Sequence, residues 1–107
     1  MTMINISAYK FVSLDENKLP SLREELLNKA RELNIKGTIL LSTEGINLFL
    51  SAAETTIENY KAFLATYSEF SDLPYKPSPS QEQPFTRMLV RIKKEIISMG
   101  VPTIKPG

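Results

Sequence analysis

The chain has 107 residues, the size of one ordinary domain, and its thirteen Lys and Arg residues nearly balance its twelve Asp and Glu residues, so the net charge of +1 indicates no partner. It contains no cysteine and no histidine, which excludes disulfides, zinc sites built on those ligands and catalysis by a thiol or a histidine-activated hydroxyl. No run approaches the ~18 apolar residues of a membrane span. The N-terminus, MTMINISAYK, lacks the basic and apolar regions of a signal peptide, so we expect a cytoplasmic protein.

The first half of the chain predicts a strand, a helix and two further strands. Residues 3–12 are rich in β-branched and aromatic types, which favours a strand. Apolar residues recur at helical spacing through residues 19–34. Two apolar runs follow, TILLS at 38–42 and INLFL at 46–50, and a short break separates them. This half therefore predicts a strand, a helix and a β-hairpin.

The second half predicts a helix, a proline-rich connection and a last strand. An apolar stripe at helical spacing indicates a helix over residues 52–66. Four prolines between residues 71 and 84 exclude a regular helix there and leave room for one short edge strand near Tyr75. Residues 85–93, FTRMLVRIK, predict the last clear strand.

This order of elements, β-α-β-β-α-β, predicts a ferredoxin-like or acylphosphatase-like α+β sandwich. Right-handed connections place both helices on one face of a mainly antiparallel sheet and leave the other face open. In this arrangement we expect the first strand to lie beside the last. We assign residues 1–97 to the domain and residues 98–107, with two prolines and a glycine at the end, to a linker.

The break between the two central strands, STEGIN, allows two interpretations. Gly45 can supply the positive φ angle that a short hairpin turn needs, and Glu44 then lies at an exposed tip. On this reading the break is a turn and nothing more. Alternatively, Glu44 is a catalytic candidate, although a single carboxylate without a visible partner is weak evidence for acid–base chemistry.

The last strand carries alternate apolar and basic residues. Because side chains alternate between the two faces of a strand, Met88, Val90 and Ile92 should face the helices. The opposite side chains are either an ordinary solvated surface or a contact surface for phosphates, with Phe85 as a stacking platform for bases. The residues on that opposite side, with two lysines that could extend the row, are Arg87, Leu89, Arg91, Lys93, Lys94 and Lys10.

The remaining aromatic residues indicate core positions. Lys10 suggests that the neighbouring Tyr9 and Phe11 point inward, and Tyr60 and Tyr67 lie on the apolar stripe of the second helix. The acidic segment SLDENK at residues 13–18 has the wrong sign for cradling an acyl phosphate, which argues against acylphosphatase activity.

Three segments in the right order resemble a known family: AYKFVSL, KGTILLSTEGIN and QPFTRMLVRIKKEIISMGVP. Together they are similar to the N-terminal domain of the rhodanese-related tRNA uridine hydroxylases, and the resemblance covers nearly the whole chain. It implies an enzyme that uses molecular oxygen to hydroxylate the wobble uridine in the anticodon of tRNA to 5-hydroxyuridine. No other cofactor is evident.

Two differences from the family stand out. Its members continue into a rhodanese domain with a catalytic cysteine, so we expect this chain to be an excised domain without sulfurtransferase activity of its own. Most members also carry a small residue where Leu48 follows EGIN, which affects local backbone geometry. The resemblance raises the weight of a role for Glu44 and Asn47 in facing the substrate or the partner domain.

Three classes of function remain open. The chain is a tRNA-binding, substrate-positioning domain of the hydroxylase, which we favour; or a scaffold domain that packs against a rhodanese partner without contacting RNA; or a self-sufficient small enzyme, which the absence of cysteine and histidine disfavours. For the first class, the expected binding residues are Asn47, Phe85, Arg87, Arg91, Lys93 and Lys94.

Overall fold

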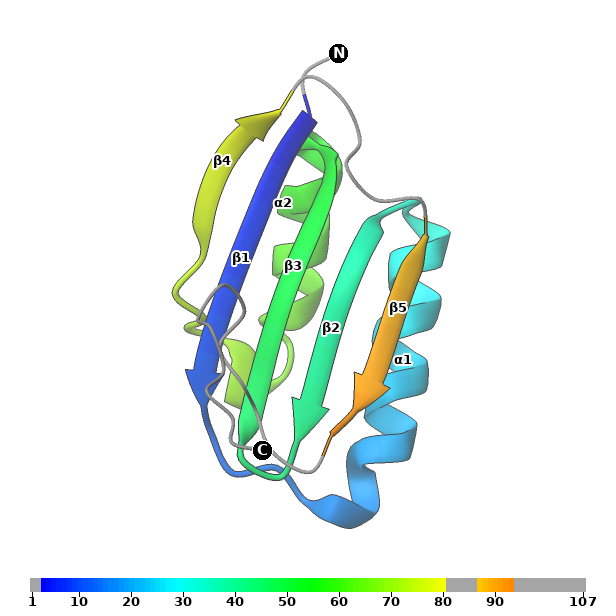
Figure 1. The fold of residues 1–107 in the computed structure, drawn as a ribbon, viewed down its shortest axis with the longest axis vertical. Coiled ribbons are helices and arrows are strands. Elements are labelled where there is room, and N and C mark those ends of the chain that lie inside the picture. Colours follow the sequence, from blue (N-terminus) through cyan, green and yellow to red (C-terminus); the bar gives the residue numbers. More distant parts are fainter. Residues whose placement is uncertain (1–2, 81–86, 94–107) are drawn as a thin grey trace, which may run out of the picture.

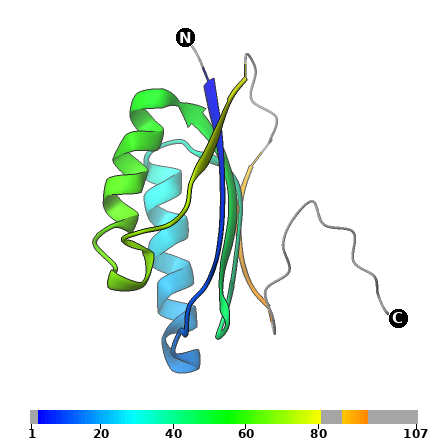
Figure 2. The same cartoon turned by 90° about the vertical axis from the view of Figure 1, so that its left-hand side faces the viewer.

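The computed structural model describes residues 3–80 and 87–93, and in these ranges two helices cover one face of a five-stranded sheet (Figure 1). Viewed from the side, both helices lie in one layer and the sheet forms the other (Figure 2). The predicted α+β sandwich is confirmed. The elements are β1 (Met3–Phe11), η1 (Glu16–Lys18), α1 (Leu19–Glu32), β2 (Lys36–Ser42), β3 (Gly45–Ala53), α2 (Glu54–Leu64), η2 (Ser68–Phe70), β4 (Lys76–Ser80) and β5 (Met88–Ile92).

The strands lie in the order β4-β1-β3-β2-β5, and all neighbours are antiparallel except the parallel pair β2 and β5. The expectation that the first strand lies beside the last is therefore wrong. The proline-containing strand β4 takes the place beside β1, and β5 pairs with β2 at the opposite edge (Figure 1).

Prolines explain why β4 is an edge strand. Pro77 and Pro79 occupy alternate positions, so both missing N–H groups fall on the same side of the strand. At the edge of a sheet that side has no neighbouring strand, and no ladder hydrogen bond is lost. The prolines predicted a short edge strand near Tyr75, but they did not predict that this strand would take the place of the last strand beside β1.

The core lies between the sheet and the helices. The even-numbered residues of β3 from Ile46 to Leu50 are completely buried, as are the apolar positions of the helices that face them. Tyr60 of α2 lies within this layer, and its hydroxyl donates a 2.8 Å hydrogen bond to the carbonyl oxygen of Leu26 in α1. This bond ties the two helices together and satisfies the buried polar end of the ring.

The expectation that Tyr9 and Phe11 are core residues is wrong. Ile6 and Ala8 supply the buried side of β1, so the odd-numbered residues face the open side of the sheet, where the Phe11 side chain is 64% exposed. Lys10 consequently lies on the helix side and does not join the basic row.

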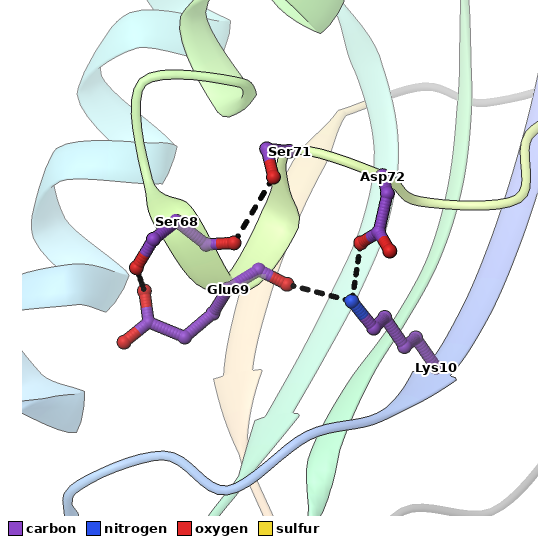
Figure 3. Close-up of polar contacts among 5 residues, drawn as sticks. All are labelled: Lys10, Ser68, Glu69, Ser71 and Asp72. Carbon is purple, nitrogen blue, oxygen red and sulfur yellow. Dashed lines mark hydrogen bonds and ion pairs between the residues drawn. The ribbon is translucent and has the colours of Figure 1, made fainter.

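On that side the Lys10 ammonium donates a 3.3 Å hydrogen bond to the carbonyl oxygen of Glu69 and pairs with the Asp72 carboxylate (Figure 3). The hydrogen bond and charge of Lys10 lower the pKa of Asp72 below its usual value. A lysine at the end of a strand can reach past the core in this way because its long apolar stem carries the charge to the surface.

Candidate nucleic-acid interface

The turn between β2 and β3 is held by its backbone. The Glu44 N–H donates to the Ser42 hydroxyl at 2.9 Å, and the Glu44 carbonyl oxygen accepts from the Val12 N–H at 2.9 Å. The carbonyl oxygen of Thr43 also accepts from the N–H of Leu14, at 3.1 Å. These bonds fasten the tip of the hairpin to the segment that follows β1.

Gly45 begins β3 with a φ of 152°, as the sequence predicts for a position with positive φ. A Cβ atom at this position would lie 2.1 Å from the carbonyl oxygen of Lys10 in β1. The glycine is therefore required by close backbone approach as well as by its φ angle. This confirms the structural part of the STEGIN interpretation.

Glu44 and Asn47 occupy different surroundings. Glu44 is exposed at the tip of the turn, whereas Asn47 is only 3% exposed, in a position paired with Tyr9 of β1 and Leu40 of β2. The structure places Asn47 on the open side of the sheet, opposite to the core residues Ile46 and Leu48. A role for either side chain in substrate binding or catalysis stays a prediction.

The alternation predicted for the last strand is confirmed where it is described. Met88 and Val90 are buried toward the helices, although Ile92, at the end of β5, is 41% exposed. Arg87, Arg91 and Lys93 are exposed along the opposite side. The other two predicted contact residues, Phe85 and Lys94, lie outside the described residues.

The helix α1 adds two arginines that our sequence analysis did not include. A groove of about 480 Å³ runs between α1 and the outer edge of β5, and Arg23, Arg31, Arg91 and Lys93 are among its lining residues. Arg23 and Arg31 are eight residues apart, with Leu27 midway, which puts them on one face of α1. The spacing in the sequence predicts that the two arginines share one face of a helix. It does not predict that this face lies beside β5.

A second groove of about 250 Å³ continues along the same edge. It shares Arg31 with the first groove and adds Lys36 and Arg87. We call the six cations that line the two grooves the basic edge: Arg23, Arg31, Lys36, Arg87, Arg91 and Lys93.

Arg23 connects α1 to β5 and also contributes a positive charge to the basic edge. Its Nε donates a 2.7 Å hydrogen bond to the carbonyl oxygen of Val90, and its terminal nitrogen pairs with Glu24 at 2.7 Å. Since β5 is an edge strand, this carbonyl has no ladder partner on its outer side. Among the described residues, the other five cations of the basic edge form no ion pair.

Acidic residues are sorted away from the sheet. Every Asp and Glu in residues 3–80 and 87–93 lies in a helix or a connection, and none lies in a strand. The described residues that line the two grooves of the basic edge likewise include no Asp or Glu. A chain with a net charge of only +1 therefore presents a locally positive edge, which favours an anionic ligand.

Two other features are absent from the described ranges. Among these residues no group of three or more Asp and Glu side chains gathers in a way that could hold a metal ion. None of the described helices has the length and apolar character needed to cross a membrane.

Residues 3–96 match the family described as UPF0176 acylphosphatase like domain. The chain belongs to this family. Among its relatives, a protein of Cupriavidus pinatubonensis named tRNA uridine(34) hydroxylase is 50% identical over 106 residues, which are 99% of this chain and 37% of the relative. A protein of Variovorax paradoxus with the same name is 48% identical over 105 residues, 98% of this chain and 39% of the relative. The resemblance to the N-terminal domain of these hydroxylases is thus confirmed, and the chain spans less than half the length of these curated relatives.

Solved structures share the fold at low sequence identity. An acylphosphatase from Bacillus subtilis superposes with a TM-score of 0.56 at 10% identity, over 87% of this chain and all of that protein. The BLUF protein BlrP1 superposes with a TM-score of 0.65 at 17% identity, over 87% of this chain and 64% of that one. At these identities the comparisons establish the architecture alone.

Proposed function

We propose that this chain is the tRNA-binding, substrate-positioning domain of a tRNA wobble-uridine hydroxylase. The observation that carries the proposal is the basic edge, where cations from α1, β2 and the segment around β5 line two adjoining grooves whose described lining residues include no Asp or Glu. The relatives named tRNA uridine(34) hydroxylase supply the substrate class, a tRNA whose target lies in the anticodon.

The basic edge suits the backbone of a nucleic acid. Phosphate contacts from Arg and Lys position a nucleic acid without reading its sequence, and each neutralised phosphate releases counterions. Arginine is well suited to this role because its guanidinium group donates two parallel hydrogen bonds to a phosphate. Four of the six cations are arginines: Arg23, Arg31, Arg87 and Arg91.

We propose that hydroxylation itself, with molecular oxygen as the co-substrate, requires the rest of the longer protein, including a rhodanese domain. The chain corresponds to only 37% of the length of the Cupriavidus pinatubonensis relative and has no thiol for persulfide chemistry. Its proposed contribution is to hold the tRNA so that the anticodon reaches the reacting site.

Glu44 and Asn47 are proposed to face the bound tRNA or the adjoining domain. Both are polar residues of the STEGIN segment, at the tip of the turn and in the strand that follows it. In the full-length hydroxylase, Glu44→Gln and Asn47→Ala should lower the amount of hydroxylated wobble uridine. The melting temperature of each purified variant is measured beside it, because Asn47 is only 3% exposed. Normal hydroxylation in both variants would leave the segment with a structural role only.

A titration with an anticodon stem-loop RNA at several salt concentrations tests the binding role. We expect weak binding by the 107-residue chain with a steep salt dependence, and Arg91→Gln or Arg31→Gln should lower the salt slope by about one unit each. Lys61→Gln is a matched control, because Lys61 lies on α2 and is paired with Glu58 at 3.2 Å.

The alternative is a scaffold domain that packs against a rhodanese partner without touching RNA. It predicts no salt-sensitive RNA binding by the wild-type chain and no difference between the Arg91 and Lys61 variants. That result would exclude the tRNA-binding proposal.

A further inference from the structure

The open side of the sheet exposes aromatic rings on β1 and β3, and β2 separates these strands from β5 of the basic edge. Phe11 of β1 is 64% exposed and Phe49 of β3 is 36% exposed, whereas no described helical residue is a comparably exposed large apolar side chain. The rings of Tyr9 and Phe11 meet edge to face, with centroids 5.2 Å apart. We call Tyr9 and Phe11 the aromatic platform.

The strand register connects this platform with the basic edge. Tyr9 pairs with Asn47, Asn47 with Leu40, and Leu40 with Arg91, so the four residues form one row across β1, β3, β2 and β5. With strands about 4.8 Å apart, Tyr9 and Arg91 are separated by on the order of 14 Å. A short stretch of single-stranded RNA is long enough to span that distance, and in RRM domains the aromatic side chains of a four-stranded sheet stack two or three bases.

The chemistry of the row favours a nucleic acid over a protein. Aromatic rings bind bases by stacking, which works for every base, while flanking cations hold the phosphates. Protein interfaces are likewise enriched in aromatic residues and arginine, so the absence of acidic residues is what favours a nucleic acid here. The strands carry no described acidic residue, which removes the main source of repulsion against a phosphate backbone.

We propose that the aromatic platform stacks unpaired bases of the RNA whose phosphates the basic edge binds. This inference rests on the tRNA-binding role and adds a preference: the open side recognises unpaired nucleotides, and the edge recognises backbone in any form. Phe11 and Tyr9 contribute the rings nearest the β2–β3 turn, because Phe11 pairs with Gly45 in the register of β1 and β3.

Fluorescence anisotropy with a labelled oligouridine strand, alone and annealed to oligoadenosine, tests the preference. Phe11→Leu and Tyr9→Leu keep apolar side chains but remove the rings. We expect each to weaken single-strand binding at least about fivefold and to leave duplex affinity unchanged. The salt slope should not move, because no charge is altered. Phe63→Leu on α2 is the matched control for loss of a ring and should bind as the wild type does.

Photocrosslinking gives an independent readout. An oligouridine that carries 5-iodouridine should crosslink to a peptide containing Tyr9 or Phe11. Two results would overturn the stacking proposal and leave the binding role of the basic edge intact. One is that crosslinks form only on β5. The other is that both Leu variants keep the single-strand affinity of the wild type while Arg91→Gln still lowers the salt slope.

Two other outcomes also overturn it. If the wild-type chain binds neither strand in a salt-sensitive way, the tRNA-binding role fails and the stacking proposal fails with it. If the Leu variants bind RNA normally but lower the thermal stability of a longer protein that includes the following domain, the open side is a protein-docking surface.

Discussion

The two sides of the sheet are made from alternate residues of the same strands, yet they differ in burial and in chemistry. On the covered side of β3, Leu48 is fully buried beneath the helices. On the open side, the neighbouring residue Phe49 is 36% exposed, and Phe11 of β1 is more exposed still. The open side also leads to Arg91 of β5, whereas among the described residues the covered side contains one charged strand residue, Lys10, which reaches out to Asp72.

The covered side of the sheet therefore serves mainly the stability of the fold, and the open side is available for recognition of a ligand. A strand has a period of two, so each successive residue can be used for a different purpose without changing the backbone. The covered side gains its stability from apolar burial, and its residues are interchangeable only with residues of similar volume. On the open side Asn47 and Ser51 are buried as well, whereas Phe11 and Arg91 are exposed and contribute little burial, so these two residues can be selected for a ligand.

The largest loss should come from the covered side. Leu48→Ala removes a completely buried side chain in the middle of β3 and should reduce the free energy of unfolding by about 2–5 kcal/mol, because a cavity remains. Urea denaturation followed by circular dichroism measures this loss. A reduction below about 1 kcal/mol would contradict the separation of the two sides.

Gly45→Ala should be the next largest change, although it alters no core side chain. The position has a φ that L-residues rarely adopt, and the new Cβ would lie 2.1 Å from the carbonyl oxygen of Lys10. We expect a loss of at least about 1–3 kcal/mol in the free energy of unfolding. Gly37→Ala should behave in the same way, since its Cβ would lie 2.1 Å from the carbonyl oxygen of Phe49. Wild-type stability in both variants would mean that these strands can move apart.

Tyr60→Phe should cost about 1 kcal/mol at neutral pH, because it removes the hydrogen bond to the Leu26 carbonyl oxygen. Burial, followed by the charges of Tyr67 and Tyr75, raises the pKa of Tyr60. The folded state therefore favours the protonated phenol, and its contribution is complete below the unfolded pKa of about 10 and is lost as the pH rises above it. Melting temperatures above pH ~10 should fall less steeply for the Phe variant than for the wild type. Parallel curves would rule out this linkage.

Phe11→Leu should have the smallest effect on stability, within about 0.5 kcal/mol, because the ring is mostly exposed. Thermal unfolding of this variant beside Leu48→Ala gives the direct comparison of the two sides. A loss as large as that of the core variant would show that Phe11 is part of the packed structure rather than of a recognition surface.

The sequence by itself determined the two helices, the central hairpin and the covered side of β5. The strong apolar periodicity in residues 19–34, 38–50 and 52–66 is compatible with few other secondary structures. The need for a glycine at position 45 followed from local turn geometry. The alternation of Met88 and Val90 with basic residues was likewise visible, because it depends only on the period of a strand.

The tertiary structure alone decided which edge receives β5 and which way β1 turns its aromatic rings. A five-residue strand can pair with either edge without changing its own pattern, and β5 lies beside β2 because the proline-containing β4 occupies the place next to β1. In β1 both alternate sets contain apolar residues, so periodicity could not choose between them. Lys10 misled the assignment because its partner, Asp72, is 62 residues away in the sequence. The sequence likewise did not predict Arg23 and Arg31 as part of the basic edge. These residues lie near β5 only in the folded chain, and the local sequence pattern of α1 does not show which strand is its neighbour.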